Sequence, residues 1–362
     1  MKKFLILAAT AVVALAACSK VEVNRPEASP ISFAPNALMT KALIFPEGNG
    51  PDKNAFPVTD SFAVFAFANI NGTGVNYATP LMGDVTIKNV NGDWKASAGT
   101  YLWPATGTVD FYAYYPATLT ASFISDVDPK GVNLTGISLG TTVGDQIDPM
   151  VGQTLNQVAS SKPKVALVFK HITSQIAATA FDATQTESLR GKITIEKVVF
   201  KNMKTTGDYR EGTAIGGGLW SNINNNTDFT SFFGSKVLTT TENYLSEGEF
   251  SASINNSAAF VVIPDYVVTG TTADQAIEVS YSIAAYTING FDYPATPTQT
   301  VSIPLYNRIT NNKFENGKRY IFHLGLSLDG ANNEIMFSPE VEGWVTEDVN
   351  GITVDVVKAT VL

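Results

Sequence analysis

One cysteine, Cys18, occupies a position that predicts a chemical modification. It follows an apolar run over residues 4–17, and Lys2 and Lys3 precede that run. A bilayer-spanning helix needs about 20 residues, so this shorter run predicts a signal peptide over residues 1–17. Because Cys18 is the only cysteine in the sequence, its thiol has no disulfide partner in the chain, and we expect it to be modified.

The residues before this cysteine, Leu15-Ala16-Ala17, resemble the lipobox of bacterial lipoproteins. The resemblance implies cleavage before Cys18 and acylation there, with diacylglycerol on the sulfur and palmitate among the acyl chains. The alternative is an ordinary signal peptide followed by an incidental cysteine. On the first interpretation, lipid attaches the chain to a membrane.

The net charge excludes some partners. The whole sequence carries −9, and removal of residues 1–17, with two lysines and no acid, changes this to −11. An acidic surface repels phosphate backbones and anionic headgroups, so we expect no nucleic-acid partner. Membrane attachment must then come from the lipid.

Few residues have the spacing of a catalytic or metal site. His171 and His323 are the only histidines, and each lies in strand-like alternation, which favours packed or half-exposed strand residues. The stretch from Asp126 to Gly131 begins like a calcium loop, but Lys130 stands at a ligand position, which favours a turn. No metalloprotease, nucleophile-elbow or phosphate-loop motif occurs. We expect no enzyme activity, no metal and no cofactor.

An aromatic cluster allows two interpretations. Tyr101, Trp103, Tyr112, Tyr114 and Tyr115 lie close together in the sequence. They could form a sugar-binding platform, which would make the chain a surface glycan-binding lipoprotein. Aromatic residues are also favoured for packing in strands, and this second interpretation needs no ligand.

Alternation with period two runs through the chain and predicts an all-β fold. Apolar residues share one face over 109–115, over 277–283 and over 320–328. Turn pairs such as Asn91-Gly92 and Asn289-Gly290 separate such segments. Many short strands joined by turns are typical of β-sandwiches.

The domain organisation follows from composition. A polar stretch, Gln153–Lys164, lies between apolar segments and predicts a boundary between about residues 155 and 165. We expect a tether with a removable first strand over 18–41, one β-sandwich over 42–160 and a second over 161–362.

The two ends of the mature chain have complementary patterns. Ile31-Ser32-Phe33 begins a strand isolated from the next one by a long segment, so a protease could separate it from its sheet and leave an apolar groove. Near the other end, Ile352, Val354 and Val356 alternate with polar residues. This segment, 345–362, is either the last strand of the second sandwich or a donor strand for another subunit, and donation would produce head-to-tail filaments.

Several motifs occur in an order that resembles the fimbrillin family, the subunits of type V pili in Gram-negative bacteria. Besides the lipobox, these are Ile31-Ser32-Phe33, Thr40-Lys41-Ala42, Phe62-Ala63-Val64-Phe65-Ala66, Tyr101-Leu102-Trp103-Pro104, Phe111-Tyr112-Ala113-Tyr114-Tyr115-Pro116, Leu167-Val168-Phe169-Lys170-His171-Ile172, Phe260-Val261-Val262-Ile263-Pro264, Asn316-Gly317-Lys318-Arg319-Tyr320 and Val341-Glu342-Gly343-Trp344.

The resemblance implies two tandem transthyretin-like β-sandwich domains and export as a lipoprotein to the outer membrane. It also implies removal of the first strand at a basic residue by a trypsin-like protease, followed by polymerisation through donor-strand exchange. The cleavage position carries over to Lys41, a lysine where the family's protease typically cuts at arginine. Arg25 is the alternative, but it precedes Pro26 and the strand, so cleavage there would free the lipid without opening a groove.

The function expected from this resemblance is that of a structural pilus subunit in cell adhesion, located at the cell surface. Its partners would be other pilus subunits, the processing protease and, through the lipid of the precursor, the outer membrane. A tip or anchor subunit that does not propagate the stalk is the alternative within the family.

Overall fold

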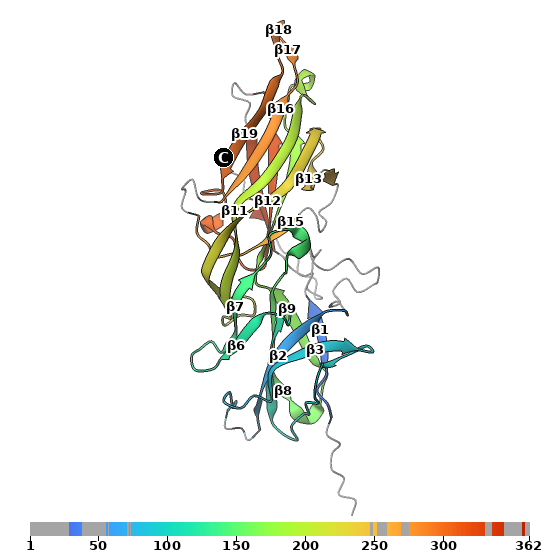
Figure 1. The fold of residues 1–362 in the computed structure, drawn as a ribbon, viewed down its shortest axis with the longest axis vertical. Helices are drawn as coiled ribbons and strands as arrows, with labels where there is room; N and C mark the ends of the chain where they lie inside the picture. Colours follow the sequence, from blue (N-terminus) through green and yellow to red (C-terminus); the bar gives the residue numbers. More distant parts are fainter. Residues whose placement is uncertain are drawn as a thin grey trace, which may run out of the picture.

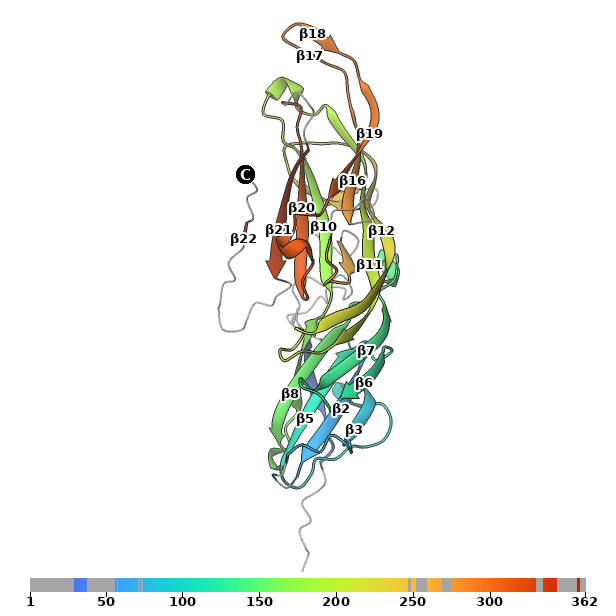
Figure 2. The same cartoon turned by 90° about the vertical axis from the view of Figure 1, so that its left-hand side faces the viewer.

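The computed structural model describes residues 29–37, 56, 58–70, 72, 74–246, 249–251, 259–268, 275–329, 335–343 and 357–358. Over this part the chain is all-β, as predicted, and elongated (Figures 1 and 2). Its helices are the 3₁₀ turns η1 (Val143–Asp145), η2 (Ala159–Ser161), η3 (Glu187–Leu189) and η4 (Thr310–Asn312). No helix in these residues is long and apolar enough to cross a membrane.

The first sheet is a closed barrel in the lower half of Figure 1. Its strands, in the order in which they pair around the barrel, are β1 (Phe33–Ala37), β4 (Asp93–Ala96), β3 (Met82–Val90), β2 (Ser61–Asn69), β5 (Thr108–Tyr115), β8 (Met150–Val158) and β9 (Val165–His171). The pairing of β9 with β1 closes the ring.

Both faces of the barrel's central strands are buried. Along β5, Val109, Phe111, Ala113 and Tyr115 point into the barrel core, which confirms the predicted face. The alternate residues, including Tyr112, pack on the outside in a separate core. Because β5 is covered on both faces, nearly all of its residues are buried. Strands covered in this way have nearly continuous apolar sequences.

Two further sheets form the upper half, and strands β6 (Thr120–Ile124) and β7 (Gly131–Ser138) of the second one extend down beside the barrel (Figure 1). The first contains β10 (Ser174–Asp182), β13 (Asn243–Ser246), β14 (Glu249–Ser251), β15 (Ala259–Val262), β20 (Lys318–Leu326), β21 (Ile335–Gly343) and β22 (Val357–Lys358). The second contains β6, β7, β11 (Ile193–Arg210), β12 (Leu219–Val237), β16 (Ala276–Ile283) and β19 (Thr296–Pro304). They enclose a core to which the predicted apolar faces of β16 and β20 both contribute.

The long hairpin of β11 and β12 joins the two halves. One part of β11 pairs with β16 of the upper half, and its last part pairs with β7 beside the barrel. Tyr209 and Trp220 of this hairpin pack in a core shared with outward residues of the barrel. The Trp220 indole N–H also donates to the Ile172 carbonyl oxygen at 2.8 Å, directly after β9. A short hairpin, β17 (Tyr286–Ile288) and β18 (Phe291–Tyr293), lies at the far tip (Figure 2).

The sheets do not divide at the predicted domain boundary. Strand β9 follows residues 155–165, yet it pairs with β8 and β1 in the barrel. Strands β6 and β7 precede that stretch, yet they extend the sheet of β11 and β16. The barrel therefore continues through His171, and the division at 160 stays a prediction.

Candidate functional site

Strand β1 fills a slot between β4 and β9. It runs parallel to β9 over five residue pairs, from Phe33 opposite Val165 to Ala37 opposite Phe169. To β4 it runs antiparallel, and Phe33 opposite Trp94 is the single pair. The hold on β1 is therefore strongly uneven between its two neighbours.

The residues before β1 extend its main-chain contacts. The Ile31 N–H donates to the Tyr101 carbonyl oxygen at 2.8 Å, and the Trp103 N–H donates to the Ser29 carbonyl oxygen at 3.0 Å. The Val165 N–H donates to the Ser32 carbonyl oxygen at 2.8 Å. Residues 29–37 together fill the slot, and we call this segment the occupant. Its main-chain pairing extends over its whole length.

Two side chains of this segment reach the barrel core. Ile31 is 3% exposed and Phe33 is 2% exposed, whereas Ala34 on the outer face is exposed. The Phe33 ring lies edge-on to Phe62 at 5.9 Å and to Phe111 at 5.8 Å between ring centroids. Such pairs add about 0.5–1.5 kcal/mol each beyond the buried area. The predicted Ile31-Ser32-Phe33 is therefore where the occupant is anchored.

Phe56 is a further aromatic residue that fills the same core, besides Phe33, and it was not predicted from the sequence. Its ring is buried and lies within 5.5 Å, between centroids, of four others, those of Phe62, Trp94, Tyr115 and Phe169. The Phe62 ring contacts both Phe33 and Phe56. The only sequence signal was a lone aromatic residue in a polar stretch before β2.

An ion pair bridges the two strands that flank β1. The Lys164 ammonium lies 3.0 Å from a carboxylate oxygen of Asp93, and both side chains are exposed. The hydrogen bond and the charge of Lys164 lower the pKa of Asp93. By register, Asp93 stands beside Ala34 and Lys164 beside Ser32, so the pair crosses the solvent face of β1.

The other predicted site residues lie outside the described part of the chain. These are Cys18, Arg25, Lys41, Ile352, Val354 and Val356. β1 ends at Ala37, a few residues before Lys41. Within the candidate donor segment, Val357 and Lys358 form β22, which pairs with β21 of the same chain. For these two residues, the structure agrees with the interpretation as a last strand of the chain's own sheet.

The aromatic cluster is not a sugar platform. Trp103, Tyr112, Tyr114 and Tyr115 are all buried, so their faces are covered by protein. The Tyr115 hydroxyl donates to Asp60 at 2.7 Å, and the Tyr114 hydroxyl donates to Asp84. Tyr101, the fifth residue of the cluster, is half-buried and packs against the barrel core. The packing interpretation is confirmed for the other four, and the glycan-binding alternative loses those four residues.

The polar candidates are structural as well. Buried His171 ends β9 and lies 2.6 Å from a carboxylate oxygen of buried Asp148, while His323 on β20 contacts Glu242. Lys130 pairs with Asp128 at 2.6 Å, which neutralises one carboxylate of the candidate calcium loop. Among the described residues, no three His, Cys, Asp or Glu side chains are grouped to hold a metal ion.

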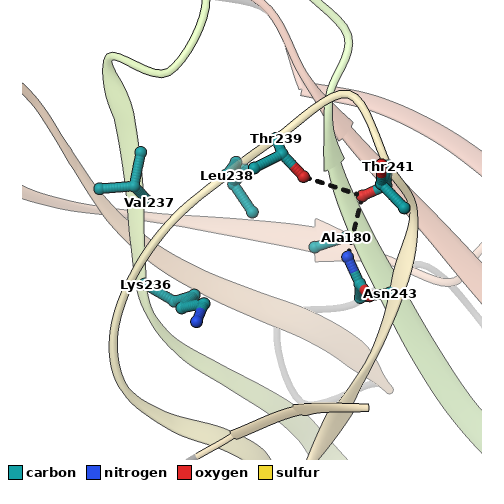
Figure 3. Close-up of a pocket in the computed structure, with 7 residues that line it drawn as sticks. All are labelled: Ala180, Lys236, Val237, Leu238, Thr239, Thr241 and Asn243. Carbon is teal, nitrogen blue, oxygen red and sulfur yellow. Dashed lines mark hydrogen bonds between the residues drawn. The ribbon is translucent and has the colours of Figure 1, made fainter. Parts of the chain in front are cut away.

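A pocket lies in the upper half, at the end of β12 (Figure 3). It has a volume of about 290 Å³, and its lining residues are Ala180, Lys236, Val237, Leu238, Thr239, Thr241 and Asn243. The Thr241 carbonyl oxygen accepts a hydrogen bond from the Asn243 side-chain amide at 3.0 Å. Among the described residues that line it, Lys236 alone is ionisable.

The comparisons with known proteins identify the family. Residues 51–344, most of the chain, match the family model described as fimbrillin-like. The chain belongs to the fimbrillin-like family. This confirms the resemblance inferred from the motifs. The comparison with curated proteins finds no match.

One of two similar solved structures shows the fold of this fimbrillin-like chain. A fimbrial protein from Bacteroides vulgatus is 16% identical with a TM-score of 0.54, and the match covers 87% of this chain and 99% of that one. The fimbrial anchor protein Mfa2 from Porphyromonas gingivalis is 9% identical with a TM-score of 0.32, covering 88% and 99%. At such identities the first match shows the fold alone, and the second is too distant to carry an argument.

Proposed function

We propose that this chain is a pilus subunit whose barrel gives up its own first strand and accepts a strand from another subunit. The observation that carries the proposal is the place of β1, which closes the barrel through five residue pairs on one side and a single pair on the other. Family membership supports the fimbrial role. The family's structural character also supports a role without catalysis.

Only one stretch of chain ties β1 to the rest of the protein. It runs from residue 38 to residue 55 and contains Lys41. A cut at Lys41 leaves β1 held by main-chain pairing and by the side chains of Ile31 and Phe33. Its departure uncovers the edge of β9, the Tyr101 carbonyl and the Trp103 amide, and buried backbone groups without partners are costly. A new strand restores these contacts.

The slot accepts a strand in either direction. Because β1 is parallel to β9 and antiparallel to β4, its two neighbours run antiparallel to each other. Any incoming strand therefore meets one parallel and one antiparallel edge. The candidate donor is the 345–362 segment, with Ile352, Val354 and Val356 as its inward residues.

The remaining parts of the proposal concern the precursor. The chain is exported, acylated on Cys18 and held at the outer membrane until a trypsin-like protease cuts near Lys41, with Arg25 as the alternative position. The mature subunits then form a surface pilus for adhesion. On this proposal, the barrel and the upper sheets correspond to the two tandem transthyretin-like domains of the family.

Limited proteolysis of the purified precursor tests the mechanism. We expect a trypsin-like protease to convert it into a ladder of polymers on unboiled gels. In a Lys53→Ala background, which removes the other lysine of the 38–55 segment, Arg25→Ala should give the same ladder, whereas Lys41→Ala should give none. A ladder from the Lys41→Ala variant would remove Lys41 from the scheme. Nicked protein that binds a donor peptide but forms no ladder would indicate a tip or anchor subunit.

A further inference from the structure

The occupant of the slot defines the shape that a replacement strand must match. Its two inward positions differ in size, since Ile31 is aliphatic and Phe33 is aromatic. The Phe33 ring meets the edges or faces of Phe62 and Phe111 at interplanar angles of 88°. A smaller side chain at this position forfeits both ring contacts and leaves a cavity beside them.

The candidate donor segment of this same chain does not match that shape. Residues 345–362, VTEDVNGITVDVVKATVL, contain no Phe, Tyr or Trp. Its alternating residues, Ile352, Val354 and Val356, would place β-branched aliphatic side chains at both inward positions. A second copy of this chain would therefore underfill the Phe33 position.

The outer face of the slot adds a second requirement. Ser32 is half-buried and Ala34 is exposed, and the ion pair of Asp93 and Lys164 crosses between them. An aromatic ring at either outward position would meet this pair. The strand that fits best alternates large and small residues, with an aliphatic side chain followed two positions later by an aromatic one.

We propose that the slot selects a strand from a different subunit, one with an aliphatic residue and an aromatic residue at positions i and i+2, over the donor segment of a second copy of this chain. The inference rests on the proposed function, because the slot must open before it can select. Selection of this kind makes growth by alternation with another subunit type more favourable than growth from identical copies, so the purified precursor alone forms its ladder only at high protein concentration.

Strand replacement can be followed with one fluorophore, because Cys18 is the only cysteine. The non-acylated chain, residues 18–362 with Lys41→Arg, is labelled at Cys18 and cut with an arginine-specific protease. Such a protease spares Lys20, and Pro26 protects Arg25. The label then leaves with the 18–41 fragment when a peptide takes the slot.

Four peptides compete for the slot. The first is the native occupant, residues 29–37, and the second is the same peptide with Phe33→Val. The third carries Ala34→Val, which adds a side chain of the same size on the outer, exposed face and is the matched control. The fourth is the donor segment's residues 350–358. The concentration that releases half of the label is measured for each.

We expect the native and Ala34→Val peptides to act at similar concentrations. The Phe33→Val peptide should need at least about 30-fold more, which corresponds to about 2 kcal/mol. The 350–358 peptide should be as weak. If it matches the native peptide, selection is overturned while strand exchange stands. If no peptide releases the fragment, the proposed function fails as well, because strand exchange requires that β1 can be replaced by another strand.

Discussion

Glu211 places a carboxyl group in the turn between β11 and β12, where water is excluded. The Tyr209 hydroxyl and the Gly216 amide each donate to it at 2.9 Å. Burial nevertheless dominates and raises its pKa from 4.5 to about 7. The folded state thus binds this proton more tightly than the unfolded state does. Stability therefore falls as the pH rises from 4.5 to 7, and the penalty is absent below that window.

Replacement of Glu211 by glutamine removes that penalty. We expect Glu211→Gln to raise the free energy of unfolding at pH 8 by up to roughly 3 kcal/mol, and to change it little at pH 4. Urea unfolding at both pH values measures this. Glu187→Gln, at an exposed position, controls for the loss of a charge. An equal effect of Glu211→Gln at both pH values would contradict the assignment.

Phe56 is a lone aromatic residue in a polar stretch of the sequence, but its packing in the barrel core makes it important for stability. Because four rings surround its side chain, we expect Phe56→Ala to lower the free energy of unfolding by about 3–5 kcal/mol. The control is Val58→Ala, at a position 67% exposed, which should change it by less than about 0.5 kcal/mol. Similar effects of the two variants would show that Phe56 is not packed as described.

At the scale of the element, the ion pair across β1 acts on the rate at which the strand leaves. Lys164→Gln should speed the release of the cut fragment several-fold at low salt. In the wild type the Asp93–Lys164 ion pair crosses the solvent face of β1 and must open before the strand can leave, and the variant lacks this pair. About 1 M salt should abolish the difference, since exposed charges are screened. Lys88→Gln, exposed on β3, is the control. A difference that persists at high salt would rule out electrostatics as its cause.

Strand faces were predictable because alternation is a local property. The apolar faces of β5, β16 and β20 appear directly in the sequence, and the structure confirms them. Barrel closure was not predictable, because β1 and β9 are parallel strands more than a hundred residues apart and alternation does not specify partners. For the same reason the polar stretch before β9 resembled a boundary although the barrel continues past it.

The candidate site was predictable in part. Ile31 and Phe33 stood out as an isolated apolar pair, and the structure places both in the barrel core. Phe56 and the ion pair of Asp93 and Lys164 did not stand out, because their partners come from strands distant in the sequence. Such contacts exist only once the barrel has formed.

At the scale of the whole molecule, the core shared by the β11–β12 hairpin and the barrel couples the two halves. Trp220 lies in this core and also bonds to the Ile172 carbonyl between them. We expect the wild type to unfold in a single calorimetric transition and Trp220→Ala to unfold in two. Leu219→Ala, 72% exposed, should behave like the wild type. A single unchanged transition for Trp220→Ala would contradict the coupling.

The closure of the barrel also controls when the protein can pair with others. A closed sheet has no free edge, so while β1 is in place this sheet offers no template for a strand of another chain. A single peptide-bond cleavage lets β1 leave, and its departure leaves a sheet with two edges, those of β4 and β9. On the proposed function, the precursor can therefore be stored at high concentration without premature assembly, and cleavage by the protease sets the time at which assembly begins.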